Sequence, residues 1–132
     1  MNKIKCLFTK DAPKPSGHYS QGVVAGDLLY VSGQLPVNPK TGEKITSSIE
    51  EQTLQALKNV EAVLISGGSS INNVIKTTVY ISDISLWERV NRVYSQFFKE
   101  HKPARAVVPT KELHYGFKIE IEAIGLIDRS KK

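Results

Sequence analysis

The first clear pattern along the chain is a pair of short apolar segments, around Val23-Val24 and at residues 28–32. The residues between them, Ala25-Gly26-Asp27, are typical of a tight turn that joins two strands. Residues 38–42 then combine Asn, Pro and Gly, which favour turns. The pattern predicts a β-hairpin followed by a break in the sheet.

Two later segments carry apolar residues at helical spacing. Each begins with a capping box, in which Ser is followed three residues later by Glu: Ser48 with Glu51, and Ser85 with Glu88. We expect the first helix to run past Leu64 and to stop at Gly67-Gly68, and Pro103 prevents the second from continuing. The second helix carries an aromatic-rich stripe made of Trp87, Val90, Tyr94, Phe97 and Phe98. Such a stripe is typical of a helix that faces the core.

The remaining segments predict strands. Residues 74–82 are rich in β-branched residues, with Ile75, Val79 and Ile81 on one face and Lys76, Thr78 and Tyr80 on the other. Two more strands are predicted at 106–110 and 117–127, joined by a loop at 113–116. Pro109 marks the first of these as an edge or bulged strand, because proline cannot donate a ladder hydrogen bond. In the second, the apolar face holds Phe117, Ile119, Ile121 and Ala123, and the polar face holds Lys118, Glu120 and Glu122.

The resulting order, β-β-α-β-α-β-β, predicts an α+β fold. Both helices can pack on one face of a mixed sheet, which makes two layers. The other face of the sheet must then be solvated or covered by another subunit. Because that face mixes Tyr, Thr, Val and charged residues, we favour burial in an oligomer.

The composition adds limits to this picture. The chain has 132 residues, of which 40% are hydrophobic and 23% charged, so residues 1–132 are expected to form a single folded domain. The longest apolar runs have four residues, far below the roughly 18 that a membrane span requires. The first eight residues lack the apolar region of a secretory signal, so we expect a cytoplasmic protein.

The charged, cysteine and histidine residues argue against nucleic-acid binding, disulfide-bonded and metal-binding proteins. The formal net charge of +5 comes from scattered basic residues, which does not favour a nucleic-acid partner. A single cysteine, Cys6, rules out an internal disulfide and a Cys-x-x-Cys pair. The three histidines, His18, His101 and His114, lie far apart in the sequence, so we expect no metal. No nucleotide-binding glycine motif is present.

Arg105 stands out because it lies where the chain enters a strand after the second helix. The planar guanidinium of arginine can bind a carboxylate through two hydrogen bonds. On the residues alone, a solvated or ion-paired Arg105 is the stronger alternative, and Glu120 and Glu122 are by default surface charges.

Several segments, in order and in register, resemble the Rid family, also called the YjgF family. They are PARAVV at 103–108, KIEIEAI at 118–124, GHYSQ at 17–21, SGQ at 32–34 with Pro36, Asn38-Pro39 with Gly42, Gln52 to Asn59, and VN at 90–91 with VY at 93–94 and Phe97-Phe98. The resemblance covers nearly the whole chain. It implies a chorismate-mutase-like fold and a homotrimer whose sheets form an inner barrel, with clefts between subunits.

The resemblance also implies site residues. In the deaminase branch, the arginine that matches Arg105 holds the substrate carboxylate, and the glutamate that matches Glu120 is associated with the hydrolytic water. Other positions that match the lining of the cleft are Tyr19, Ser32, Gly33 and Asn91, with a backbone N–H near Val107. The chain departs from the family pattern at His18, at Val107, and in the loop 113–116, which lacks the frequent proline after leucine.

The resemblance, with these residues, implies a hydrolase that converts short 2-imino acids, and their enamine tautomers from pyridoxal-phosphate dehydratases, to 2-oxo acids and ammonia. The imines 2-iminobutanoate and 2-iminopropanoate are the expected substrates, and no cofactor is expected. Two alternatives remain open at the level of the sequence. One is a trimeric sensor that binds 2-oxo acids without turnover, and the other is an RNA-directed translation inhibitor or ribonuclease.

Overall fold

The computed structural model describes residues 3–130, which form six strands, two α-helices and three short 3-10 helices. In chain order these are β1 (Ile4–Leu7), β2 (Gly22–Ala25), β3 (Leu28–Gln34), α1 (Ile49–Ser66), η1 (Ile71–Asn73), β4 (Val74–Ile81), η2 (Ile84–Leu86), α2 (Trp87–Phe98), β5 (Ala104–Pro109), η3 (His114–Gly116) and β6 (Ile119–Leu126). Both predicted helices and all five predicted strands are present. One strand, β1, was not predicted.

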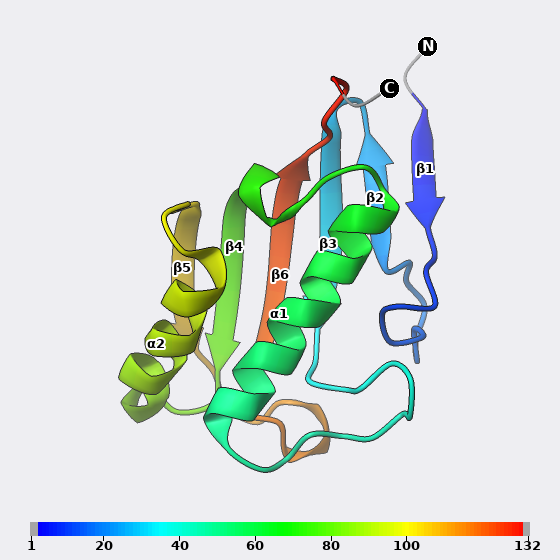
Figure 1. Ribbon diagram of the computed structural model, residues 1–132. Coiled ribbons are helices and arrows are strands. Elements are labelled where there is room, and N and C mark those ends of the chain that lie inside the picture. The colour runs from blue at the N-terminus through cyan, green and yellow to red at the C-terminus, as the bar shows by residue number, and fades with distance from the viewer. Residues whose placement is uncertain (1–2, 131–132) are drawn as a thin grey trace.

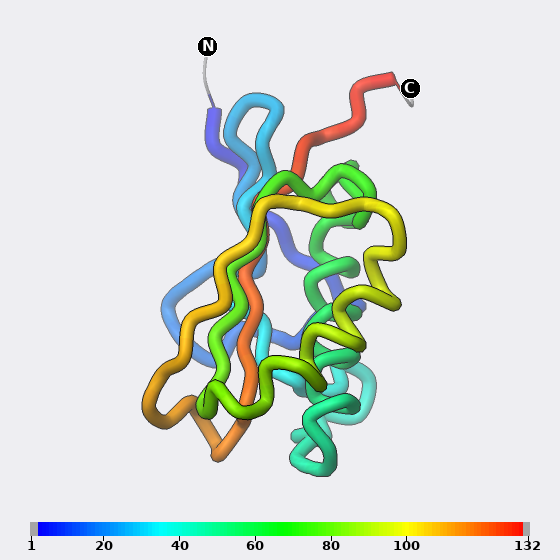
Figure 2. Tube along the Cα trace, turned by 90° about the vertical axis from the view of Figure 1, so that its left-hand side faces the viewer, coloured from blue at the N-terminus to red at the C-terminus, as the bar shows by residue number. Residues whose placement is uncertain are grey.

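All six strands belong to one sheet with the order β1-β2-β3-β6-β4-β5 (Figure 1). The β4–β5 pair is parallel and every other pair is antiparallel, so the sheet is mixed. Figure 2 views the molecule from the side and shows that α1 and α2 lie on the same face of the sheet. The predicted two-layer α+β fold is therefore confirmed. The prediction that Pro109 lies in an edge strand is also confirmed, because β5 ends the sheet.

The unpredicted strand β1 pairs antiparallel with β2, with Leu7 opposite Gly22. Of its four residues only Leu7 is buried, while Ile4, Lys5 and Cys6 are exposed. A strand with one buried residue has no apolar alternation for a sequence pattern to detect. Its existence depends on pairing with the edge of β2.

The core lies between the helices and the inner face of the sheet. Helix α1 contributes Ala56, Leu57, Val60, Val63 and Leu64, all of which are fully buried. The predicted capping box is confirmed at its start, where the Glu51 N–H donates to Ser48 Oγ at 3.1 Å. The helix ends at Gly67, where a Cβ would overlap the Leu29 side chain on β3. The close approach of α1 to the sheet therefore requires glycine at this position.

The second capping box is wrong, because the chain first makes the 3-10 turn η2. Asp83 Oδ1 accepts a hydrogen bond from the Ser85 N–H at 2.8 Å, and α2 begins only at Trp87, with no side-chain cap. An aspartate carboxylate two residues upstream competes effectively for a free amide. The stripe of α2 is buried at Val90, Tyr94 and Phe98, as predicted, but Trp87 is exposed.

Strand β4 departs from simple alternation. A β-bulge between Val74 and Lys76 shifts its register against β6. As a result Ile75, predicted to face inward, is 46% exposed, while Val74 and Thr77 are buried. The predicted burial of Val79 and Ile81 is confirmed.

Candidate functional site

Arg105 lies on the edge strand β5, opposite the buried Thr77 of β4, and its side chain faces α2. The guanidinium Nη1 donates to Asn91 Oδ1 at 2.9 Å. Its central carbon lies 4.7 Å from the ring centroid of Tyr94 and 5.7 Å from that of Trp87. Among residues 3–130 no carboxylate forms an ion pair with Arg105. A half-buried guanidinium is thus held in place by neutral groups, and its charge stays available to an anion.

The aromatic support of Arg105 is itself anchored in the core. The hydroxyl groups of Tyr94 and Thr77 form a buried hydrogen bond of 2.6 Å. Burial raises the pKa of Tyr94 above its ordinary value, and the Thr77 hydrogen bond and the Arg105 charge offset part of this rise. The phenol is therefore neutral at physiological pH and offers its ring face to the guanidinium.

Glu120 lies on β6, opposite Tyr80 of β4. Its carboxylate covers Gly33 of β3 so closely that a Cβ built on Gly33 would overlap it. Glycine at this position is therefore required for the observed place of the carboxylate. The pocket around Glu120 is lined by Ser16, Gly17, Tyr19, Ser32, Gly33, Leu35, His114 and Tyr115.

The electrostatics of this pocket favour a basic carboxylate. Burial raises the pKa of the Glu120 carboxyl above the 4.5 of an ordinary glutamate, the positive charge of His114 opposes the rise, and Glu122 adds to it. A carboxylate with a raised pKa accepts a proton from water more readily than an exposed one. The Ser32 hydroxyl already donates a hydrogen bond to the Ser20 carbonyl at 2.6 Å, so its proton is not available to a ligand in this arrangement.

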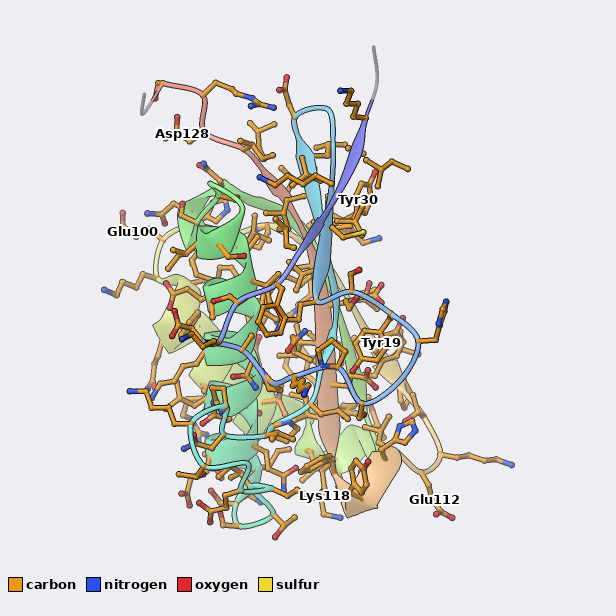
Figure 3. The ribbon with its side chains drawn as sticks, turned by 90° about the vertical axis from the view of Figure 1, so that its right-hand side faces the viewer. Tyr19, Tyr30, Glu100, Glu112, Lys118 and Asp128 are labelled. Atoms are coloured by element: carbon orange, nitrogen blue, oxygen red, sulfur yellow. The ribbon has the colours of Figure 1, made fainter. Side chains whose placement is uncertain are left out.

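The structure divides the predicted site residues into two groups. Arg105 and Asn91 lie on the side of the sheet that the helices cover. The second group, on the opposite side, consists of Tyr19, Ser32, Gly33 and Glu120. Figure 3 shows labelled Tyr19 on a loop on the side of the sheet away from α1. Within one chain, Arg105 and Glu120 therefore do not share a pocket. We call the two groups the arginine half-site and the glutamate half-site.

Val107 lies next to the arginine half-site on β5, opposite Val79. Its side chain packs against the core. Because β5 is an edge strand, one side of its backbone pairs with no strand of residues 3–130. That free edge is where a backbone N–H can meet a ligand.

Several residues that contact or line the half-sites were not predicted from the sequence, among them four with aromatic side chains. Tyr94 and Trp87 were interpreted only as core residues, whereas both rings lie against the Arg105 guanidinium. A Tyr in such a stripe can present both its hydroxyl group and its ring face to the strand that it packs on. His114 and Tyr115 lie in the loop that departs from the family pattern, and both line the glutamate half-site. That departure was the available signal for them.

Two kinds of feature are absent from the described part of the chain. Residues 3–130 contain no cluster of three His, Cys, Asp or Glu side chains that could hold a metal ion. Over the same residues, no helix combines the length and the apolar character needed to cross a membrane.

The sequence matches the protein family described as Endoribonuclease L-PSP over residues 9–127. A RutC family protein of Pyrococcus horikoshii is 48% identical over 119 residues, which cover 90% of this chain and 94% of that protein. A protein of Escherichia coli named 2-iminobutanoate/2-iminopropanoate deaminase is 42% identical over 125 residues, which cover 92% of this chain and 97% of that protein.

A solved structure described as E. coli TdcF with bound serine is similar in fold, with a TM-score of 0.89 and 39% sequence identity. The match covers 94% of this chain and 99% of that chain. The similarity therefore extends over nearly the whole chain.

Proposed function

The chain belongs to the endoribonuclease L-PSP family, also called the Rid or YjgF family, and on this basis we propose that it hydrolyses short 2-imino acids to 2-oxo acids and ammonia. The observation that carries the proposal is the half-buried Arg105 guanidinium, which has no carboxylate partner in residues 3–130. The E. coli relative that bears the name of such a deaminase supports the choice of substrate. The expected substrates are 2-iminobutanoate and 2-iminopropanoate.

The proposed active site forms between two copies of the chain in a homotrimer. The two half-sites lie on opposite sides of the sheet, so one copy must supply Arg105 and its neighbour Glu120. The side of the sheet without helices exposes apolar residues, among them Tyr30, Val108 and Leu126. Exposed apolar residues on one face are typical of a surface that another subunit covers.

In the proposed mechanism Arg105 binds the substrate carboxylate and so fixes the C=N carbon. Glu120 takes a proton from a water molecule whose oxygen bonds to that carbon, while the C=N π electrons move to nitrogen, which accepts a proton from solvent and so gives a carbinolamine. The amino nitrogen then takes the proton held by Glu120, and ammonia leaves with the C–N electron pair as the hydroxyl proton is lost to water and the C=O bond forms. The backbone edge at Val107 can donate a hydrogen bond to the substrate.

This mechanism needs no cofactor and no protein nucleophile. Imines hydrolyse in water without a catalyst, so the protein has to remove only a few kcal/mol of barrier, at about 1.4 kcal/mol per tenfold in rate. Positioning by one guanidinium and proton transfer to one carboxylate are enough for that change.

The test is ammonia release from imines that a pyridoxal-phosphate dehydratase generates from threonine or serine in the same solution. We expect the wild-type protein to speed ammonia release and Arg105→Ala to lose nearly all of this effect. The binding of 2-oxobutanoate is measured in parallel by calorimetry. Binding without any acceleration of ammonia release would show a carboxylate-binding protein instead of an enzyme.

A further inference from the structure

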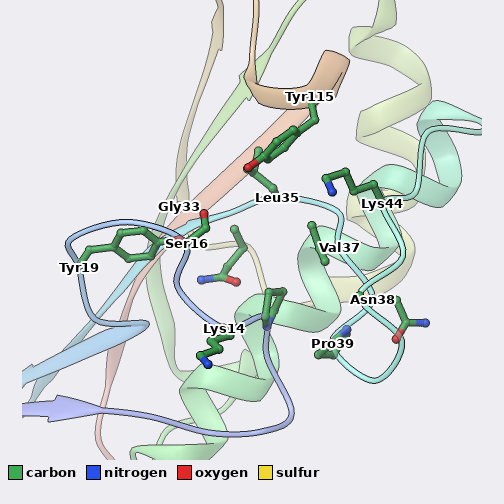
Figure 4. Close-up of a pocket in the computed structure, with 13 residues that line it drawn as sticks. Lys14, Ser16, Tyr19, Gly33, Leu35, Val37, Asn38, Pro39, Lys44 and Tyr115 are labelled. Atoms are coloured by element: carbon green, nitrogen blue, oxygen red, sulfur yellow. The ribbon is translucent and has the colours of Figure 1, made fainter.

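A second cavity adjoins the glutamate half-site (Figure 4), and the proposed mechanism gives it no role. We call it the loop pocket, because it lies between the loop before β2 and the loop after β3. It has a volume of about 280 Å³. It shares Ser16, Tyr19, Gly33, Leu35 and Tyr115 with the half-site, so the two cavities adjoin. The loop pocket is therefore the cavity nearest to a group that extends from the C=N carbon of an imine at Glu120.

The first wall of the loop pocket is held by a buried amide. Gln21 is 1% exposed, and its Nε2 donates to the carbonyls of Thr9, Ala12 and Pro13 at 3.0, 3.2 and 3.0 Å. Its Oε1 accepts a hydrogen bond from the Thr9 N–H. A fully paired buried amide fixes the backbone around it. This wall, which carries Lys14 into the pocket, is therefore ordered.

The second wall is held in the same way from α1. Asn59 is 1% exposed, and its Nδ2 donates to the carbonyls of Leu35 and Val37 at 3.0 and 2.9 Å. Val37 in turn forms an antiparallel β-bridge with Lys44. Lys44 therefore reaches the pocket from a backbone position that pairing defines.

The loop pocket is cationic at two points and has apolar sides. Lys14 and Lys44 line it, no Asp or Glu does, and neither lysine forms an ion pair with a carboxylate of residues 3–130. Leu35 and Val37 supply apolar surface. Figure 4 shows Lys44 next to the ring of Tyr115, whose centroid lies 4.7 Å from Nζ. This contact holds the ammonium at the pocket wall.

Tyr115 makes this contact from a strained backbone conformation. Its φ of 59° places it in the left-handed region, which is unfavourable for a residue with a side chain. The ring is supported by an edge-on contact with the buried Phe117, with centroids 5.9 Å apart. Strain of this kind is found most often at binding sites.

We propose that the loop pocket binds the side chain of 2-imino acids that end in a second carboxylate, such as 2-iminoglutarate. This inference rests on the proposed function, because Arg105 of the neighbouring copy binds the first carboxylate and Glu120 faces the C=N carbon. The methylene groups of the side chain then pack against Leu35 and Val37, and the second carboxylate meets Lys44, while Lys14 on the opposite wall adds positive charge to the pocket. In this way the chain accepts dicarboxylic imino acids in addition to the short ones of the proposed function.

The experiment is calorimetric binding of 2-oxoglutarate and of 2-oxobutanoate, which are stable analogues with and without the second carboxylate. We expect 2-oxoglutarate to bind at least about fivefold more tightly, with an advantage that declines as NaCl is raised. Lys44→Gln should remove most of that advantage and leave 2-oxobutanoate binding within about twofold, and Lys14→Gln should remove part of it. Lys40→Gln is the matched control, because Lys40 is exposed on the same loop without lining the pocket.

The outcomes separate the two proposals. If 2-oxobutanoate binds but 2-oxoglutarate binds no better, or if Lys44→Gln and Lys40→Gln behave alike, the loop pocket is not a carboxylate subsite and the deaminase proposal stands. If neither acid binds to the folded protein at millimolar concentration, the carboxylate site at Arg105 is itself wrong. Relative rates of hydrolysis of the imines formed from glutamate and norvaline by an amino-acid oxidase should follow the same order as the binding.

Discussion

At the scale of the residue, the contacts around Arg105 depend on the planar shape of its guanidinium and not only on its positive charge. Asn91 takes one N–H of the guanidinium, and Tyr94 lies against its flat face. Both contacts use the planar shape of the group, whereas the ammonium of a lysine has neither the plane nor the fork. The orientation of the cation therefore depends on arginine in particular.

The first prediction concerns this residue. Arg105→Lys should lower kcat/KM for imine hydrolysis at least about tenfold, because one positive charge remains but the two-point contact with the carboxylate is lost. Arg105→Ala should abolish nearly all activity. The measurement is ammonia release at several substrate concentrations, with the folded state checked by circular dichroism. Full activity of Arg105→Ala in the folded protein would refute the deaminase function.

The second prediction concerns the pH dependence of Glu120. Glu120 acts as a base in its deprotonated form, and burial raises its pKa above 4.5, so activity should fall as the pH drops through a value higher than 4.5. The positive charge of His114 lowers this pKa. His114→Gln should therefore move the acidic limb of the kcat/KM profile to higher pH, and Glu120→Gln should lower kcat while 2-oxobutanoate still binds.

Two results would contradict these roles of Glu120 and His114. If Glu120→Gln turns over imines at the wild-type rate, the carboxylate is structural and the water is activated by another group. If the acidic limb stays in place in His114→Gln, the histidine does not act on Glu120.

At the scale of the element, the two helices begin in different ways. Helix α1 begins with a side-chain cap from Ser48, whereas α2 follows a 3-10 turn that Asp83 caps. The start of α2 is also tied to α1, because Arg89 donates two hydrogen bonds of 2.7 Å to the Glu50 carboxylate. The position of α2 over the sheet matters for the site, since Asn91 and Tyr94 must reach Arg105.

The third prediction compares the two serines that begin a predicted capping box. Ser48→Ala should lower the free energy of unfolding by about 1 kcal/mol, because the Glu51 N–H at the start of α1 loses its acceptor. Ser85→Ala should cost much less, because the Ser85 side chain does not cap α2. Urea unfolding at one fixed protein concentration measures both, since assembly makes stability depend on concentration. Equal losses for the two variants would contradict the observed start of α2.

At the scale of the whole molecule, the sheet separates two groups of residues that the proposed reaction needs together. Arg105 points toward the helices and Glu120 points away from them. One copy of the chain therefore carries both half-sites and no complete site. Assembly becomes a condition of activity, and it has two measurable consequences.

The fourth prediction is that the protein sediments as a trimer and not as a monomer of 14.6 kDa at micromolar concentration. A stable monomer that hydrolyses imines would contradict the proposed site between copies.

The fifth prediction uses two variants that are each defective. When Arg105→Ala and Glu120→Gln chains are produced together, a site that takes Arg105 from one chain and Glu120 from its neighbour is intact in about a quarter of cases with random assembly. Mixed trimers should therefore recover about a quarter of the wild-type rate, whereas each variant alone stays defective. No recovery in mixed trimers would place both residues in the same chain's site.

The sequence by itself determined the local structure of this protein. Apolar spacing predicted α1, α2 and five strands, because the periods of helix and strand are properties of neighbouring residues. The motif around Arg105 and the strand around Glu120 indicated the two chemical groups. Ser48 was a correct helix start, since the Glu51 N–H three residues away binds its hydroxyl, whereas at Ser85 the Asp83 carboxylate takes the free amide.

The tertiary structure alone decided what depends on distant contacts. Strand β1 exists through pairing with β2, and the bulge that exposes Ile75 exists through pairing with β6, so neither has a local pattern. Arg105 lies on the helix-covered side of the sheet because β5 pairs with β4 in the register that sets Arg105 opposite the buried Thr77, and no short segment encodes that register. Lys14 and Lys44 share a pocket because two buried amides, Gln21 at the end of the first loop and Asn59 on α1, hold the loops that carry them. Such contacts join residues that are remote in the chain, and only the folded molecule brings them together.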